Sequence, residues 1–267
     1  MDRPPVIFSA RDLADLRQAR ALLENPSYTV RLSNLIGSPI EKALTLLPKG
    51  WNAKVNDIAK AALYGALDLA IASTRPRRLH TPASNRWHKI LVGASGGIGG
   101  AFGLAALAVE LPVSTTIMLR SIVEIARSEG HDPTAVATKL DCLEVFAFNG
   151  VNRTSNPNET AYWVTRLALS QSVTDAAAYL AGKSAIEKTA PAVTRLVAAI
   201  ASRFGVIVSE EAAAKAMPVL GAVGGSVANV IFMDHFQQMA RGHFIVRRLE
   251  KKYGQEAVRE RYEAAGA

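Results

Sequence analysis

Cysteine is almost absent from this chain of 267 residues, and aromatic side chains are scarce. The single cysteine, Cys142, excludes an internal disulfide and any Cys-x-x-Cys metal or redox pair, which suits a reducing compartment. Aromatic residues make up only 6% of the chain, and no zinc-finger, helix-turn-helix or aromatic-plus-basic RNA-binding motif is present. We therefore expect no disulfide scaffold and no nucleic-acid partner.

The short motifs that identify common reactions are also missing. The glycine cluster at 93–100 has no Gly-Lys-Ser/Thr ending and no preceding strand, so it is neither a P-loop nor a dinucleotide-binding turn. Gly93-Ala-Ser-Gly-Gly97 has no credible strand before it, so we do not expect it to form the nucleophile elbow of a hydrolase. The first residues, Met-Asp-Arg-Pro-Pro, lack the charged-then-apolar pattern of a secretory signal. We expect a cytoplasmic protein with no cofactor and no metal ion, and we favour a non-enzymatic role.

Two nearly charge-free, glycine-rich runs, 90–109 and 216–233, dominate what the sequence does contain. Small residues at helical spacing let helix backbones approach closely. The runs therefore predict an all-α fold, a multi-helix bundle around two glycine-rich central helices. Each run is also close to the length of a membrane span, so insertion into a membrane surface and a true span are alternatives. Glycine adds little transfer energy, which favours the buried arrangement.

Helical periodicity covers most of the chain. Ser9 is a predicted helix cap, Asn25-Pro26 ends the first helix, and Pro39 is expected to kink or divide the second. Pro112 is expected to separate two helices, and 206–208 is a strand-like run. The predicted helices cover residues 10–24, 28–47, 53–73, 86–109, 113–128, 134–148, 161–183, 185–204 and 219–253.

Changes in composition divide the chain into three parts. Residues 1–50 are predicted to form an N-terminal amphipathic helical segment and residues 51–253 the main helical domain, followed by a short tail at 254–267. A subdomain break is expected at 74–85, where two prolines and several basic residues interrupt the helical pattern.

The charge balance is basic, with a formal net charge of +8 and a pI near 9.7. A basic surface favours anionic partners, and without a nucleic-acid motif these are anionic lipid or a membrane-protein complex. The alternative is that a net charge of this size only keeps the protein in solution. Homo-oligomerisation is a further option. The candidate contacts with an anionic surface lie in two basic segments and are Arg75, Arg77, Arg78, Arg86, Lys89, Arg247, Arg248, Lys251 and Lys252.

A polar stretch begins at Asp234, on a helix that is apolar before it. His235 and His243 are eight residues apart, roughly 12 Å along a helix, so they cannot share one metal ion. Asp234, Gln238 and Arg241 fall on a common helix face and predict a hydrogen-bonded acid–amide–guanidinium ladder.

Glu110 lies near the predicted carboxyl end of a helix, where the helix dipole disfavours an acid. Glu110 is expected either to be exposed to solvent or to pair with Arg120, with Arg241 or with a histidine of the last long helix, and we expect Glu124 to pair with Arg120. If such acids converged on a histidine, they could bind a divalent ion or act as acid and base. The candidate catalytic residues are Glu110, Glu124, Asp234, His235 and His243, and the expected structural polar network is Arg120, Asn229, Gln238 and Arg241.

Several blocks, in order, resemble the EcsC family. They are residues 93–100 leading to Glu110-Leu-Pro112, residues 119–126, residues 143–147, and a C-terminal block from Pro218 through Asn229 and Asp234-His-Phe-Gln237 to Glu250. The resemblance spans about residues 50–253. It implies a bacterial, mainly helical, cytoplasmic-side protein whose namesake is encoded beside an ABC exporter. It implies no established reaction and no accepted catalytic set.

These observations lead to one preferred function and two alternatives. We expect a non-enzymatic accessory protein that associates reversibly with the cytoplasmic membrane face or a transport complex. A hydrolase or metal-dependent enzyme with an interhelical Glu/Asp/His site is the first alternative. Helix-mediated homo-oligomerisation is the second, and it predicts a large exposed apolar patch.

Overall fold

The computed structural model describes residues 6–24, 28–72, 103–149, 160–181, 190–217 and 221–265, and every regular element within these ranges is helical. The prediction of an all-α, multi-helix fold is therefore confirmed. The elements are α1 (Ala10–Leu23), α2 (Tyr28–Ile36), α3 (Ile40–Leu44), α4 (Trp51–Ala72), α6 (Gly103–Ser128), α7 (Val136–Glu144), the 3₁₀ turn η1 (Val145–Ala147), α8 (Ala161–Leu180), α9 (Pro191–Ala216), α10 (Gly221–Tyr253) and α11 (Gln255–Ala264).

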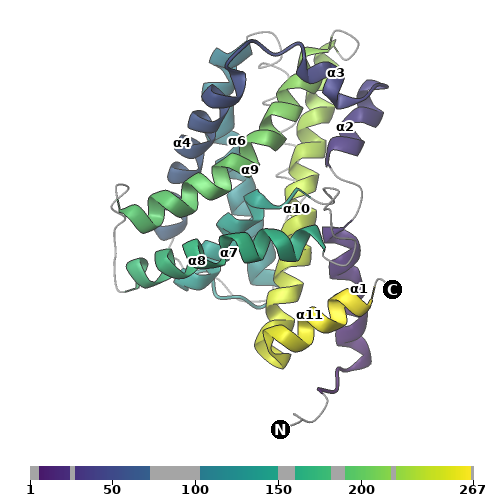
Figure 1. Cartoon of the computed structure of the whole chain (residues 1–267), viewed down its shortest axis with the longest axis vertical. Helices are drawn as coiled ribbons and strands as arrows, with labels where there is room; N and C mark the ends of the chain where they lie inside the picture. The colour runs from purple at the N-terminus through teal and green to yellow at the C-terminus, as the bar shows by residue number, and fades with distance from the viewer. Residues whose placement is uncertain are drawn as a thin grey trace.

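Helix α10 is the long axis around which the other helices are arranged (Figure 1). Its 33 residues extend for roughly 50 Å, given a rise of 1.5 Å per residue. Helix α6 runs parallel to it, because Glu110 contacts Asn229 near the start of both helices and Glu129 contacts Arg248 near the end of both. Gln237 donates a hydrogen bond to Ser121 between these two points. These three contacts define how α6 and α10 are aligned along their lengths.

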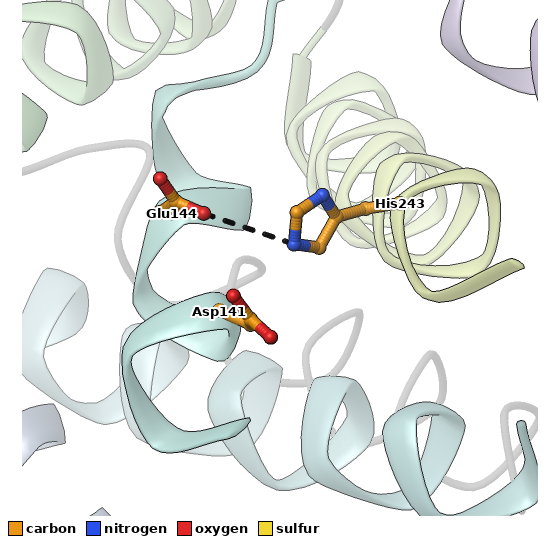
Figure 2. A group of neighbouring side chains, drawn as sticks. All are labelled: Asp141, Glu144 and His243. Atoms are coloured by element: carbon orange, nitrogen blue, oxygen red, sulfur yellow. Dashed lines mark ion pairs between the residues drawn. The ribbon is translucent and has the colours of Figure 1, made fainter. Parts of the chain in front are cut away.

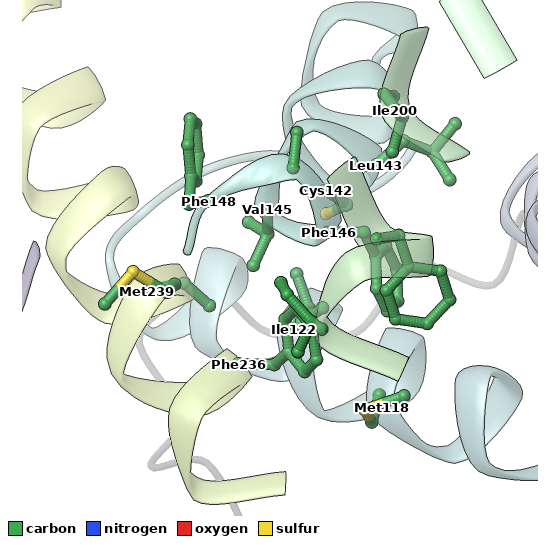
Figure 3. Packing of buried hydrophobic residues seen from close by; sticks show 14 of the residues in the cluster. Met118, Ile122, Cys142, Leu143, Val145, Phe146, Phe148, Ile200, Phe236 and Met239 are labelled. Carbon is green, nitrogen blue, oxygen red and sulfur yellow. The ribbon is translucent and has the colours of Figure 1, made fainter. Parts of the chain in front are cut away.

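The core lies where α4, α6, α9 and α10 meet the short segment α7–η1. Phe236 of α10 is fully buried, with its ring centroid 5.1 Å from that of Phe232, 5.3 Å from Phe146 and 5.7 Å from Phe204. Figure 3 shows Phe236 beside Ile122 of α6, with Phe146 next to them. Aromatic rings from three elements therefore hold the long helices together.

The two ends of the described chain pack together at the lower end of α10 in Figure 1. Helix α1 lies along α10, capped by the Ser9 hydroxyl as the sequence predicts. Arg20 of α1 donates hydrogen bonds to the carbonyl oxygens of Tyr262 and Glu263 in α11. The ring of Phe8 stacks on that of Tyr253 at 4.1 Å. The N-terminal helix is thus packed against the main helical body.

Proline has opposite effects at two positions. Pro39 separates α2 from α3 as predicted. Pro112 does not end a helix, and the prediction of a break there is wrong: α6 continues from Gly103 to Ser128 with Pro112 inside it. Leu111 just before the proline and Thr115 after it are both buried, so tertiary packing on both sides of Pro112 keeps the helix continuous.

The prediction that a helix ends at 204, before a strand-like run at 206–208, is also wrong. These residues lie inside α9, which begins at Pro191 and continues to Ala216. Phe204, Ile207 and Val208 are all buried and repeat at helical spacing, so burial of this face overrides the β-propensity of the branched residues.

The two glycine-rich runs are only partly described. Residues 90–102 of the first lie outside the described residues, as does the expected break at 74–85, while the second run contains the start of α10 at Gly221. Among the described helices, α9 is the one long and apolar enough to span a membrane, with a mean hydropathy of 1.6. In its most apolar part 56% of the residues are buried in the protein, so core packing accounts for this apolar character.

Gly242 sets the distance between α1 and α10, and this predicts a large effect of one methyl group. A Cβ atom at Gly242 would lie 2.6 Å from Cγ of Leu23 and 3.0 Å from the carbonyl oxygen of Ala19. We expect Gly242→Ala to lower the free energy of unfolding by about 1–3 kcal/mol, because the backbone oxygen cannot move aside. Urea denaturation followed by circular dichroism measures the change.

Gly65 provides the matched control for that prediction. It lies on the exposed side of α4, and in the described part of the chain no atom beyond its own helical turn lies within 4 Å of an added Cβ. Gly65→Ala is expected to raise stability by about 0.5–1 kcal/mol, because alanine loses less conformational entropy in a helix. Equal effects of the two substitutions would contradict close packing at Gly242.

Candidate functional site

Helix α10 carries most of the polar residues that the sequence singles out, and it spreads them along its length. Asn229, Asp234 and His243 occupy three levels of this helix. Asn229 and His243 are 14 residues apart, which corresponds to roughly 21 Å of helix rise. Glu110 lies at the level of Asn229, so the proposed set of acids and histidine does not gather at one place.

The negative charge of Glu110 is balanced by a partner that the sequence analysis did not predict. Its carboxylate accepts hydrogen bonds from Lys215 at 2.9 Å and from Asn229 at 3.2 Å. The expectation of Arg120, Arg241 or a histidine was wrong, because Glu110 lies inside α6 and meets the carboxyl end of α9. Lys215 also pairs with Glu211 at 3.1 Å. Burial raises the pKa of Glu211 to about 7, although Lys215 acts in the opposite direction.

The predicted ladder on α10 is present in part. Gln238 donates a hydrogen bond to Asp234 at 2.6 Å, as expected for residues one turn apart. The guanidinium that pairs with Asp234, at 2.7 Å, is that of Arg31 from α2. His235 is buried and donates its Nε2 hydrogen to the carbonyl oxygen of Phe148 at 2.9 Å. Burial lowers the pKa of His235 to about 4, so the ring is neutral at pH 7.

The remaining polar candidates, Arg120, Glu124 and Arg241, lie at exposed or half-buried positions of α6 and α10. Arg120 is exposed and Glu124 half-buried on α6, and pairing between them stays a prediction. Arg241 is half-buried on α10, three residues beyond Gln238.

The basic residues near the end of α10 are partly engaged by acids. Arg247 pairs with Asp141 at 3.0 Å and Arg248 with Asp15 at 2.9 Å. Lys252 pairs with Asp12 at 2.6 Å but remains more than half exposed. Exposed Lys251 lies 3.1 Å from Nδ1 of His131. The other candidate contacts with an anionic surface, Arg75, Arg77, Arg78, Arg86 and Lys89, lie outside the described residues.

A group that the sequence analysis did not assemble surrounds His243. This histidine is completely buried, and its Nδ1 lies 2.9 Å from the hydroxyl of Tyr162 on α8. Its Nε2 faces Glu144 of α7 at 3.9 Å, marked by the dashed line in Figure 2. Asp141 lies one turn before Glu144 on the same helix. The ligand atoms of Asp141, Glu144 and His243 all lie within 4.8 Å of one another.

Two arginines and a third acid close this group. Arg166 of α8 makes two hydrogen bonds to Glu250, at 2.5 and 3.2 Å, and Arg247 reaches the same carboxylate at 3.0 Å. Arg247 also holds Asp141 through its Nε. We call Asp141, Glu144, Tyr162, Arg166, His243, Arg247 and Glu250 the polar cluster.

Burial dominates the electrostatics of the polar cluster. It raises the pKa of Glu144 to about 7 and also raises that of Asp141, against the attraction of Arg247. It lowers the pKa of His243 well below its usual value, and both nearby arginines act in the same direction. His243 is therefore a neutral imidazole at pH 7.

The sequence contained a signal for this cluster that went unused. Asp141 and Glu144 are three residues apart in the sequence Leu140-Asp-Cys-Leu-Glu144. All five of these residues are buried. Acids inside an apolar helical segment are rarely buried unless they are paired. Tyr162 and Arg166 are likewise one turn apart at the start of α8. Their meeting with α10 depends on the tertiary fold, so sequence spacing alone does not reveal it.

Residues 13–249 match the EcsC protein family. This chain belongs to the EcsC protein family. The match begins at residue 13, so the EcsC region includes most of α1 and all of α2, which the resemblance found from the sequence left out. No curated protein and no solved structure matches the chain.

The EcsC region also contains an open groove away from the polar cluster. The groove has a volume of about 720 Å³ and lies between the segment joining α3 to α4 and one face of α9. Leu47, Trp51 and Glu210 are among its lining residues. Burial raises the pKa of Glu210 to about 7, and the hydroxyl of Thr29 donates to its carboxylate. None of the residues predicted as catalytic lines this groove.

Proposed function

We propose that this EcsC-family protein is a non-enzymatic accessory protein that docks reversibly on the cytoplasmic face of a membrane. The docking surface is the end of the molecule where α6 and α10 begin. A transport complex embedded in that membrane is a second target for the same surface. The proposal rests mainly on apolar side chains exposed at this end.

Four valines carry the proposal. Val109 and Val113 lie one turn apart on α6 and are 71% and 51% exposed. Val227 and Val230 are exposed near the start of α10. The hydrogen bond from Asn229 to Glu110 places the two pairs at the same level of the molecule. Exposed apolar side chains that cluster in this way are typical of surfaces that contact a protein or a membrane.

The sequence carries a cluster of positive charge shortly before α6. Five basic residues between 75 and 89 precede the uncharged run that leads into α6. Each positive charge near an anionic headgroup contributes roughly 1 kcal/mol to membrane binding. The basic residues at the far end of α10 are poorly placed to assist, because Val230 and Arg247 are separated by 17 residues, or roughly 26 Å of helix.

The enzymatic alternative has less support from the geometry. It required Glu110, Asp234 and His243 to converge, and these residues instead contact Lys215, Arg31 and Tyr162 at separate levels. Such ion pairs and hydrogen bonds give a structural reason for burying each of these groups.

Sedimentation with vesicles tests the proposal. We expect the full chain to sediment with vesicles containing anionic phospholipid, and the bound fraction to fall at high salt as the charges are screened. Val109→Glu combined with Val113→Glu is expected to reduce the bound fraction at least several-fold, because acids replace apolar side chains at the contact.

Leu167→Glu is the control for this experiment. Leu167 is 70% exposed on α8, so its substitution adds an exposed acid outside the docking surface. It should leave vesicle binding unchanged. Failure of the unmodified chain to bind at either salt concentration, or an equal loss of binding in both variants, would overturn the proposal.

A further inference from the structure

We propose that Asp141, Glu144 and His243 form a binding site for one divalent transition-metal ion, best fitted by Zn²⁺, which clamps α7 to α10. The inference is independent of membrane docking. It follows from the arrangement of the three side chains in Figure 2, from an unpaired ring nitrogen and from the balance of charge around them.

The geometry is close to that of a metal site. One carboxylate oxygen from each of Asp141 and Glu144 and one ring nitrogen of His243 all lie within 4.8 Å of one another. Zinc binds oxygen and nitrogen ligands at about 2.0–2.2 Å, and its ligands then lie about 3.3–3.6 Å apart. Movements of about an ångström or less in the side chains would complete three corners of a tetrahedron. Two acids and one histidine also form a ligand set that suits first-row divalent ions.

The Nε2 atom of His243 supplies the second, independent observation. It is buried and has no hydrogen-bond partner among the residues that the structure describes. Its distance of 3.9 Å from Glu144 is too long for a hydrogen bond. A buried polar atom of this kind normally has a partner. A metal ion between Nε2 and the two carboxylates would provide one.

The other ring nitrogen is already oriented as metal sites require. Nδ1 lies 2.9 Å from the hydroxyl of Tyr162, and when it donates its hydrogen to that oxygen, Nε2 carries a lone pair directed toward Glu144. Ligating histidines usually donate their second N–H to such an outer partner, and ligating carboxylates are hydrogen-bonded in turn. Asp141 meets the second condition, because Arg247 donates to its Oδ2 at 3.0 Å.

The polar cluster has one more acidic group than it has arginines, so a cation could balance its charge. Three carboxyl groups, those of Asp141, Glu144 and Glu250, face two guanidinium groups. Arg166 and Arg247 both bind Glu250, and Arg247 also binds Asp141. Glu144 is the acid that has no arginine hydrogen-bonded to it in this set. A metal ion or a proton can neutralise it, and these two states are distinguishable by experiment.

The site is closed rather than open. Glu144 and His243 are both buried, and Tyr162 covers the histidine. Structural zinc sites have four protein ligands, whereas catalytic sites with three keep a position for water or substrate. These side chains supply three of the four ligands, and their burial favours an ion that contributes to folding. We therefore assign the ion a structural role.

Metal binding to the full chain tests the inference. After treatment with a chelator and its removal, we expect the protein to bind one equivalent of Zn²⁺ and to show a higher Tm when Zn²⁺ is restored. Mg²⁺ at the same concentration should have little effect, because it requires octahedral oxygen ligands. Co²⁺ substituted for Zn²⁺ should give visible absorption bands that report the ligand set without relying on a variant.

Two variants locate the ion. Glu144→Gln keeps the shape of the side chain and should weaken Zn²⁺ binding by more than about 100-fold, since loss of a direct ligand exceeds the effect of an outer-shell change. Glu210→Gln is the control. Like Glu144, Glu210 is a buried acid with a raised pKa, but it lies on α9 and accepts a hydrogen bond from Thr29 instead of facing His243. It should bind Zn²⁺ like the unmodified chain, and circular dichroism confirms that both variants fold.

Two results would overturn the site. The first is the absence of saturable binding and of any Zn²⁺-dependent rise in Tm in the unmodified chain. The second is equal Zn²⁺ affinity in Glu144→Gln and Glu210→Gln. Higher stability of Glu144→Gln, with no effect of Zn²⁺ on either protein, would show that a proton neutralises Glu144 instead.

Discussion

Replacement of Glu250 by alanine is expected to lower the free energy of unfolding by about 3–5 kcal/mol, because it leaves the buried guanidinium of Arg166 without its paired acid. Arg166 loses both of its hydrogen bonds to this carboxylate, and Arg247 loses one. The side chains of Arg166 and Glu250 are only 11% and 6% exposed, so water cannot replace the lost contacts. Chemical denaturation measures the loss, which corresponds to a fall in Tm of about 10 °C for a protein of this size.

Asp175→Ala is the matched control for this substitution. Asp175 pairs with Arg195 at 3.1 Å on the surface, with side chains 31% and 59% exposed. A surface ion pair of this kind contributes about 0–1 kcal/mol, so the control should change stability little. If Glu250→Ala were as mild as Asp175→Ala, the polar cluster would not be the buried ion-pair network that the structure shows.

Phe236→Ala is expected to have a comparable effect of about 3–5 kcal/mol for a different reason, the cavity left in the aromatic core. Phe236 is completely buried, and its ring contacts those of Phe146, Phe204 and Phe232. These rings come from η1, α9 and α10, so the cavity would open where three elements meet. Urea denaturation followed by circular dichroism gives the change in unfolding free energy.

Leu167→Ala serves as the control for the cavity. Leu167 is a large apolar residue that is 70% exposed, so its truncation removes little buried surface. The expected change lies within about 0.5 kcal/mol. A loss of less than about 1 kcal/mol for Phe236→Ala would mean that the surrounding rings collapse into the space, contrary to the close packing in Figure 3.

Local interactions were the most predictable part of this protein. The Ser9 cap and the hydrogen bond from Gln238 to Asp234 follow from spacings of three and four residues within one helix. The end of α2 before Pro39 follows from the conformational limits of proline. These features depend on neighbours in sequence, so the sequence is sufficient to predict them.

Features that depend on packing were missed or wrongly predicted. Pro112 and the branched residues at 206–208 carry strong local signals against a continuous helix, yet both lie inside long helices. Their buried neighbours, Leu111 beside the proline and Ile207 within the run, make tertiary contacts that outweigh the local preference. A signal taken from a few adjacent residues cannot include those contacts.

The candidate site shows the same division. His243 was found from the sequence because it lies on a polar stretch of a long helix, but its partners were not. Glu144 is 99 residues away in the chain and Tyr162 is 81 residues away. Glu110 and Asp234, which the sequence grouped with His243, instead contact Lys215 and Arg31.

The sequence by itself determined the helical class, most helix positions and the polar residues of α10, because helix periodicity and capping are encoded within a few turns. The tertiary structure alone decided which charges meet, which proline is tolerated and which acids face His243. Helical periodicity fixes the face on which a side chain lies, but the partner opposite that face depends on how distant helices pack. In this protein that packing brings α7, α8 and α10 together around buried charges.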